Sequence, residues 1–145
     1  MTAREFLSQV YKIDLRIDSK REQIEHLNEL ANKCTSTLTG MPRNPSPSAS
    51  AMADAVSAIV DLEKEIAEDM RELIRVKKQI TAVIGSVENL EYQTLLERRY
   101  LNEDTWEEIA VNMHYSSKWI MKLHSLALDA VERILNSERV PKSSV

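Results

Sequence analysis

The sequence predicts an all-α protein in which a long antiparallel heptad hairpin precedes a compact helical domain near the C-terminus. Only two of the 145 residues are glycine and one is phenylalanine, whereas 29% are charged. Strands favour β-branched and aromatic residues between glycine-containing turns, so this composition favours helices. Apolar residues also recur at steps of three and four over two long stretches, and three of the four prolines lie between these stretches.

The first stretch predicts one long helix from Phe6 to Leu38. Its apolar residues are Phe6, Val10, Ile13, Ile17, Ile24, Leu27, Ala31, Cys34 and Leu38, and only Lys20 interrupts the series. A heptad pattern sustained in this way is typical of a helix that packs along its length against another helix. The lone cysteine, Cys34, falls on this apolar face, so we expect a buried thiol.

A proline-rich loop is expected next, over residues 39–51. The segment from Thr35 to Ala51 reads TSTLTGMPRNPSPSASA. Proline lacks a backbone N–H and restricts the residue before it, so no helix is expected through Met41 to Pro47.

The heptad pattern resumes after this loop. Its apolar residues are Met52, Val56, Ile59, Ile66, Met70, Leu73, Ile80, Ile84 and Val87, with Glu63 and Lys77 as exceptions. Two such helices predict an antiparallel hairpin over residues 1–87. A hairpin alone buries little apolar surface, so we expect a homo-oligomer, with a dimer favoured. Charges at the heptad positions Lys20, Glu63 and Lys77 would set the register of the pairing.

A separate helical domain is expected over residues 88–136, with a disordered tail at 137–145. Leu95, Leu96, Tyr100 and Leu101 give a first helix its apolar side, which ends near Asn102. Thr105 and Glu108 then have the spacing of a capping box, so a second helix is expected from Trp106.

This second helix is short and leads into a third. His114, Tyr115 and Ser116 form the expected turn, and Ser116 is a suitable N-cap for a helix from Ser117. The residues expected to face inward are Trp106, Ile109, Ala110, Met113, Ile120, Leu123, Ala127, Leu128 and Val131. A short helix, a tight turn and a second helix predict a helix-turn-helix. His114 occupies the turn position that favours a residue tolerant of positive φ.

The run LLERRYLNEDTWEEIAVNMHYSSKWIMKLHSLALDAV, within residues 95–131, resembles region 4 of sigma-70-type factors. Both have a leading helix with an "RY" element, a [TS]-x-EEIA helix and a Ser-capped recognition helix. The whole chain, with TSTL at Thr35–Leu38 and Met41-Pro42, resembles small phage and prophage proteins of Gram-positive bacteria. These proteins are related to late-gene transcription activators of the ArpU and RinA type.

The resemblance implies a recognition helix that enters the major groove of promoter DNA. The implied contact residues are Ser116, Ser117, Lys118, Trp119, Met121, Lys122 and Ser125. Lys122 would donate to guanine, Lys118 to a base or a phosphate, and Ser117 to a phosphate. Trp119 either contacts DNA or a partner, or packs on a neighbouring helix. Arg98 and Arg99 either contact the DNA backbone or pair with nearby carboxylates.

The chain departs from the sigma pattern early in the recognition helix. Sigma region 4 typically carries arginine and glutamate there, where this chain has Ser117, Lys118 and Trp119. Fewer forked donors imply weak binding by the domain alone. Two alternatives to a transcription regulator therefore stay open. One is an interaction module that binds RNA polymerase or a sigma factor without DNA, which the net charge of −4 favours. The other is a small-terminase-like packaging protein.

Catalysis, cofactors and membrane insertion are not expected. The sequence has no nucleophile–base pair and no glycine-rich phosphate loop, and His26, His114 and His124 share no metal-ligand spacing. We expect these histidines at the surface or in turns. Charges interrupt every apolar stretch, and Met1–Val10 lacks the pattern of a signal peptide. The expected location is the cytoplasm of a bacterial host cell.

Overall fold

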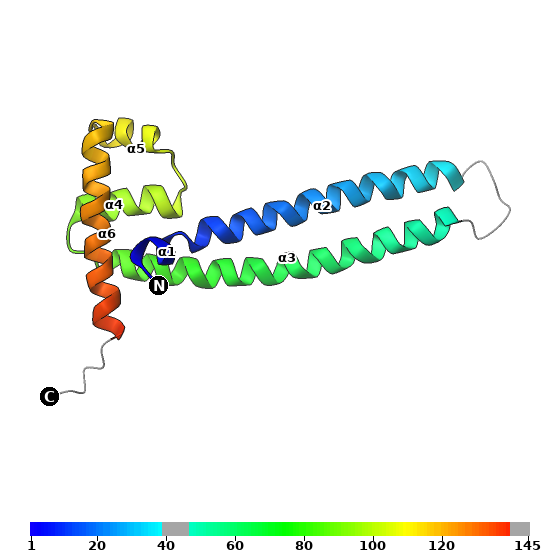
Figure 1. Cartoon of the computed structure of the whole chain (residues 1–145), viewed down its shortest axis with the longest axis horizontal. Helices are drawn as coiled ribbons and strands as arrows, with labels where there is room; N and C mark the ends of the chain where they lie inside the picture. The colour runs from blue at the N-terminus through cyan, green and yellow to red at the C-terminus, as the bar shows by residue number, and fades with distance from the viewer. Residues whose placement is uncertain (39–46, 140–145) are drawn as a thin grey trace. The chain divides into compact units, whose positions relative to one another are not determined.

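The computed structural model describes residues 1–38 and 47–139, apart from the side chains of residues 35–38, 47–48 and 139. Every element in this part of the chain is helical (Figure 1), which confirms the expected all-α class. The elements in chain order are α1 (Ala3–Leu7), α2 (Gln9–Leu38), α3 (Pro47–Gly85), α4 (Leu90–Leu96), the π-helical turn η1 (Glu97–Leu101), α5 (Trp106–Met113) and α6 (Ser117–Arg139). They form two compact units, Ile13–Glu72 and Met1–Lys12 with Leu73–Val145.

In the unit Ile13–Glu72, α2 and α3 lie side by side and run in opposite directions (Figure 1). The pairs Arg16–Glu72 and Lys20–Glu65 show this direction, because the later residue of α2 meets the earlier residue of α3. The side chains between the helices are buried or half-buried: Ile13, Ile17, Ile24 and Leu27 from α2, and Ala55, Ile59, Leu62 and Ile66 from α3. Cys34 is half-buried rather than fully buried, and the side chain of Leu38 lies outside the described residues.

The inward face of α3 differs from the predicted heptad series at two positions. Val56 and Met70 are 46% and 44% exposed, while their neighbours Ala55 and Asp69 are buried. One residue along a helix turns the side chain by about 100°, so apolar residues in adjacent positions can serve two different faces. The pattern of apolar residues alone does not show which of the two faces meets α2.

The helix ends also differ from the sequence prediction. α3 already begins at Pro47, so residues 47–51 are helical rather than loop. Proline suits the first position of a helix, where no N–H is needed. Residues 39–46 of the predicted loop lie outside the described residues. The predicted first helix is divided at Ser8, and Thr2 caps the short α1 in a capping box with Glu5.

In the second unit, α1, α4 and α5 pack against α6. The backbone N–H of Ala3 donates to the Glu132 carboxylate of α6 at 2.7 Å, so the N-terminus belongs to this unit. The end of α3 adds the buried residues Val76, Ile80, Val83 and Ile84 to its core. α6 runs to Arg139, so residues 137–139 of the predicted disordered tail are helical, and 140–145 lie outside the described residues.

The loop between α3 and α4 is held by its own polar groups. The side-chain amide of Gln93 donates to the carbonyls of Gly85 and Val87, at 3.2 and 2.8 Å. Asn89 caps α4 by accepting from the N–H groups of Glu91 and Tyr92. Among the described helices, none has the length and apolar character needed to cross a lipid bilayer.

Candidate nucleic-acid interface

α5 begins at Trp106 because Thr105 caps it. The Thr105 hydroxyl accepts from the backbone N–H of Glu108 at 3.2 Å, which is the first half of the predicted capping box. Ile109 and Ala110 are buried, and the small side chain of Ala110 suits a close approach of two helices. α5 and α6 are in direct contact.

The turn after α5 has the geometry of a Schellman motif. His114 lies in the left-handed region, with φ 60° and ψ 39°. Its N–H donates to the carbonyl of Val111 at 3.3 Å, and the N–H of Tyr115 donates to the carbonyl of Ala110 at 3.0 Å. These two bonds satisfy carbonyls that the end of α5 leaves free. The expected positive φ at His114 is therefore confirmed.

α6 begins at Ser117, directly after this turn. The Ser116 hydroxyl accepts from the N–H of Trp119 at 3.2 Å, so the predicted N-cap is confirmed. Ile120, Leu123, Ala127 and Val131 are buried and fix the inner face of α6. Side chains at the intervening positions must point away from the core, so they form the outer face of α6.

The outer face of α6 includes the residues implied as DNA contacts. Ser116, Ser117, Lys118, Trp119, Met121, Lys122 and Ser125 are all exposed. No carboxylate occurs in α6 before Asp129, so Lys118 and Lys122 give this face a positive charge. The N-terminal end of a helix also carries a partial positive charge, which adds to theirs. This face can bind an anionic partner.

Trp119 stands at the edge of this face and is 41% exposed. Lys122 Nζ lies 5.5 Å from the centroid of the Trp119 ring, and the ring of Tyr115 meets Trp119 edge-on at a centroid distance of 6.2 Å. The Tyr115 hydroxyl donates to the Glu91 carboxylate of α4 at 2.8 Å. Glu91 therefore places one negative charge near the start of α6. This hydrogen bond also raises the pKa of Tyr115 above its ordinary value.

Arg98 and Arg99 contact other protein groups. Arg98 forms an ion pair of 3.6 Å with Asp104, and Arg99 donates to the backbone carbonyl of Asp104 at 3.1 Å. The guanidinium of Arg99 also lies 4.3 Å from the centroid of the Trp106 ring. Arg98 thus has the carboxylate partner of one alternative, whereas the partners of Arg99 are a backbone carbonyl and an aromatic ring. These contacts hold the turn between η1 and α5.

His124 is buried on the inner side of α6 and does not lie at the surface or in a turn as expected. It is 6% exposed, and its Nε2 lies 2.6 Å from the hydroxyl of Tyr100. Trp106 meets its ring edge-on at 4.6 Å between centroids. Burial, together with the charges of Arg4 and Arg99, lowers the pKa of His124 to about 4. Its position between Leu123 and Ala127, on the inner side of α6, is the sequence feature that could have indicated this burial.

These features define an all-α protein that exposes a positively charged helix face beside a tight turn. The chain belongs to the family described as "Protein of unknown function (DUF1492)", whose model matches residues 49–132. The match covers nearly all of α3, the turn at His114 and most of α6. No curated protein and no solved structure matches the chain.

Proposed function

We propose that the chain is a non-catalytic DNA-binding transcription regulator that uses α5, the His114 turn and α6 as a helix-turn-helix. The main observation for this proposal is the exposed face of α6, which carries Lys118 and Lys122 and no carboxylate before Asp129. A helix of this kind fits the major groove of B-DNA. The inner face is anchored by Ile120 and Leu123, so the outer face stays available.

The resemblance to sigma region 4 supports the same assignment and adds a context. It makes the proposed target a promoter in a bacterial cell, and the resemblance to phage and prophage proteins makes late-gene control the proposed process. In this proposal Lys122 reads a base, Lys118 contacts a base or a phosphate, and Ser117 contacts a phosphate. Arg98 and Arg99 are left out of the contact set because both are engaged within the protein.

The proposed site alone binds weakly. Lysine is a single point donor, whereas arginine can bind guanine through two hydrogen bonds. Glu91 and the net charge of −4 oppose the approach of phosphates. Linking two sites in one dimer raises the effective concentration of the second site, so a dimer supplies the affinity that one α6 lacks.

Selection from random DNA tests the proposal. The full chain is mixed at low salt with duplexes that contain a randomised central segment, and retained duplexes are amplified and sequenced. We expect a defined motif, and a gel shift on that motif should weaken at least about tenfold for the variant Lys118→Ala with Lys122→Ala. The control, Lys12→Ala with Lys78→Ala, makes the same charge change at two other exposed lysines. Equal retention by both double variants would show that α6 does not bind DNA.

A protein-interaction module is the second candidate function. Leu90 and Val111 are each 72% exposed, and Met121 is 42% exposed in the α6 face itself. Exposed apolar residues of this kind are more useful in a protein interface than on a phosphate backbone. In this alternative the same region binds RNA polymerase or a sigma factor. Capture of purified RNA polymerase core by the full chain, lost on Val111→Glu, with no motif in the DNA selection, would favour it.

A further inference from the structure

α3 has a second heptad face that does not meet α2. Val56, Val60, Glu63, Ala67 and Met70 follow one another at steps of four, three, four and three, and all are exposed. Val56, Val60 and Met70 are 46%, 42% and 44% exposed. We call these five residues the α3 stripe. It extends over about 21 Å of helix at 1.5 Å per residue.

The α3 stripe is separate from the face that packs on α2. The α2-facing residues Ala55, Ile59, Leu62 and Ile66 follow the same steps one residue earlier. A shift of one residue turns the side chains by about 100°, so α3 presents two adjacent apolar faces and uses one within the unit Ile13–Glu72. Helices with two such faces are typical of bundles with more than two helices.

The pairing between α2 and α3 leaves its own core partly open. Among the side chains of this unit that the structure describes, only Ile13, Ile17 and Ala55 are buried apolar residues, while Ile24, Leu27, Ile59, Leu62 and Ile66 stay half-exposed. A two-helix unit cannot surround its core, so a further helical layer is needed to complete it.

A row of alternating charges borders the α3 stripe. Asp61, Lys64, Glu68 and Arg71 are all exposed and follow one side of the stripe along α3. When the rows of two copies are aligned in antiparallel orientation, each charge lies opposite a charge of the other sign. Asp61 then faces Arg71 of the second copy, and Lys64 faces Glu68. In a parallel pair the charge row would instead lie beside the α2-facing side of the second copy's stripe, away from the second copy's own row.

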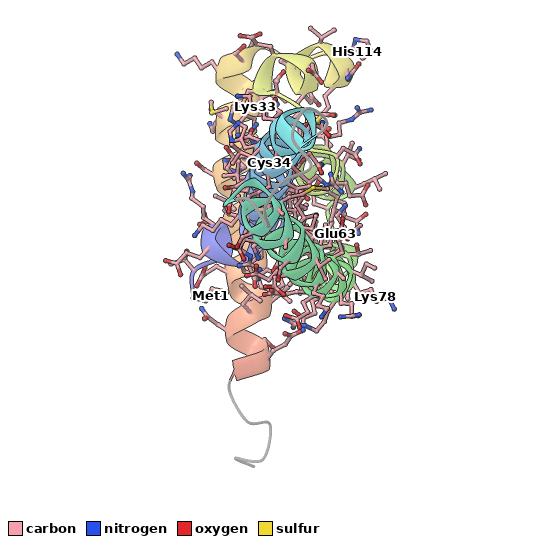
Figure 2. All side chains as sticks on the ribbon, turned by 90° about the vertical axis from the view of Figure 1, so that its right-hand side faces the viewer. Met1, Lys33, Cys34, Glu63, Lys78 and His114 are labelled. Atoms are coloured by element: carbon pink, nitrogen blue, oxygen red, sulfur yellow. The ribbon has the colours of Figure 1, made fainter. Side chains whose placement is uncertain are left out.

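The single charge within the stripe favours the same orientation. When two α3 helices run antiparallel about residue 65, Glu63 lies opposite Ala67 of the other copy, and Val60 lies opposite Met70. This register is shifted by about 3 Å along the axis from the one that aligns the charge row. A small partner lets the Glu63 carboxylate reach water beside the interface. In a parallel pair Glu63 would face Glu63, and like charges at a heptad position destabilise the pairing. Glu63 can be found on α3 in Figure 2, where Lys33 and Cys34 mark α2.

We propose that the α3 stripe binds the α3 stripe of a second copy of this chain in antiparallel orientation, which forms a four-helix dimer. The inference does not depend on DNA binding, and its test contains no DNA. A dimer was already expected. The proposal specifies its surface, its orientation and the residues that select a second copy over another partner.

Sedimentation equilibrium of the full chain measures the association. We expect a mass of twice the chain mass of 16.6 kDa for the wild type. Val60→Lys with Met70→Lys should give 16.6 kDa, because both residues are exposed in the single chain and become buried in the dimer. The control is Leu15→Lys with Leu30→Lys, which changes two similarly exposed residues of α2, at 50% and 52%, and should stay dimeric.

A charge inversion keeps the test independent of whether the stripe variant folds. Asp61→Lys with Glu68→Lys makes the row uniformly positive and should give a monomer. Adding Lys64→Glu and Arg71→Glu inverts the full row, restores its complement and should restore the dimer. The proposal would be overturned by a monomeric wild type or by a ring of higher mass. It would also be overturned if both sets of variants remained dimeric.

Orientation is read by cross-linking. In a Cys34→Ser background, Glu63→Cys and Ala67→Cys proteins are mixed and oxidised. The antiparallel pair predicts a disulfide between the two different variants and little within Glu63→Cys alone. Efficient cross-linking of Glu63→Cys to itself would show a parallel pair and overturn the proposed arrangement.

Discussion

The ammonium group of Lys20 lies 2.7 Å from Oδ2 of Asp69, between α2 and α3. The side chains are only 16% and 10% exposed, and Arg16 reaches the same carboxylate through Oδ1 at 3.0 Å. Burial alone would raise the pKa of Asp69, but the hydrogen bonds from Lys20 and Arg16 hold it below its ordinary value. The carboxylate therefore stays ionised and joins the two helices.

Removing one partner of this pair should destabilise the protein more than removing both. Asp69→Ala leaves Lys20 without its closest counter-charge, so we expect a loss of about 2 kcal/mol in the free energy of unfolding, measured by urea and circular dichroism. Lys20→Leu with Asp69→Leu should recover most of it, because two apolar residues replace the ion pair. The control Glu72→Ala removes a carboxylate that is 43% exposed and should change less than about 1 kcal/mol. A double variant with a lower free energy of unfolding than Asp69→Ala would contradict this explanation.

Lys20 also shows how far the sequence was informative about this unit. The interrupted heptad series placed Lys20 on the face toward the partner helix, and the structure confirms that position. It did not reveal Asp69, because a heptad count treats a charge one residue before Met70 as an ordinary solvated residue. The choice between two adjacent apolar faces of α3 depends on the partner helix, and that information is tertiary.

The C-terminal elements were more predictable, because their signals are local. The caps at Thr105 and Ser116 and the left-handed turn at His114 each depend on a few neighbouring residues. The contact of Tyr100 with His124 joins residues that are 24 positions apart, and the contact of Arg99 with Trp106 depends on the path of the turn between them. No short sequence pattern indicates either contact. The sequence therefore predicted the elements of the candidate site but not the contacts behind it.

Acid should destabilise the protein through His124. Its pKa is about 4 in the folded chain, below the ordinary value of 6.5, so the unfolded chain binds more protons between these values. Stability from this group is complete above pH 6.5, falls as the pH drops toward 4, and changes no further below that. We expect a loss of about 2 kcal/mol across this window. Urea unfolding at pH 7 and pH 4.5 measures it.

The exposed His26 provides a control for that measurement. His124→Leu should remove most of the pH dependence between 6.5 and 4, whereas His26→Leu should leave it in place. An equal pH dependence in wild type and His124→Leu would assign the effect to other groups.

The turn between α5 and α6 should become more stable with glycine at position 114. His114 holds a φ of 60°, which a side chain disfavours and glycine adopts freely. We expect His114→Gly to raise the melting temperature, with a gain of up to about 1 kcal/mol, and His114→Val to lower it by about 1 to 2 kcal/mol. The control Asn112→Gly, within α5, should lose about 0.5 to 1 kcal/mol. If both glycine variants lose stability equally, the left-handed turn is not present in solution.

The two lysines of the α6 face should differ in how they affect DNA binding. A lysine on a phosphate releases about one counterion, so its removal lowers the slope of log affinity against log salt by about 0.9 on any duplex. We expect this result for Lys118→Ala if Lys118 contacts a phosphate. Lys122, whose Nζ lies over Trp119, is proposed to read a base. Lys122→Ala should therefore relax sequence preference at one position, with a penalty of about 1 to 3 kcal/mol on the selected motif and little on unrelated duplexes. Lys78→Ala, at an exposed lysine of α3 outside the charge row, should change neither quantity. A Lys122→Ala variant that weakens every duplex equally would place Lys122 on the backbone instead.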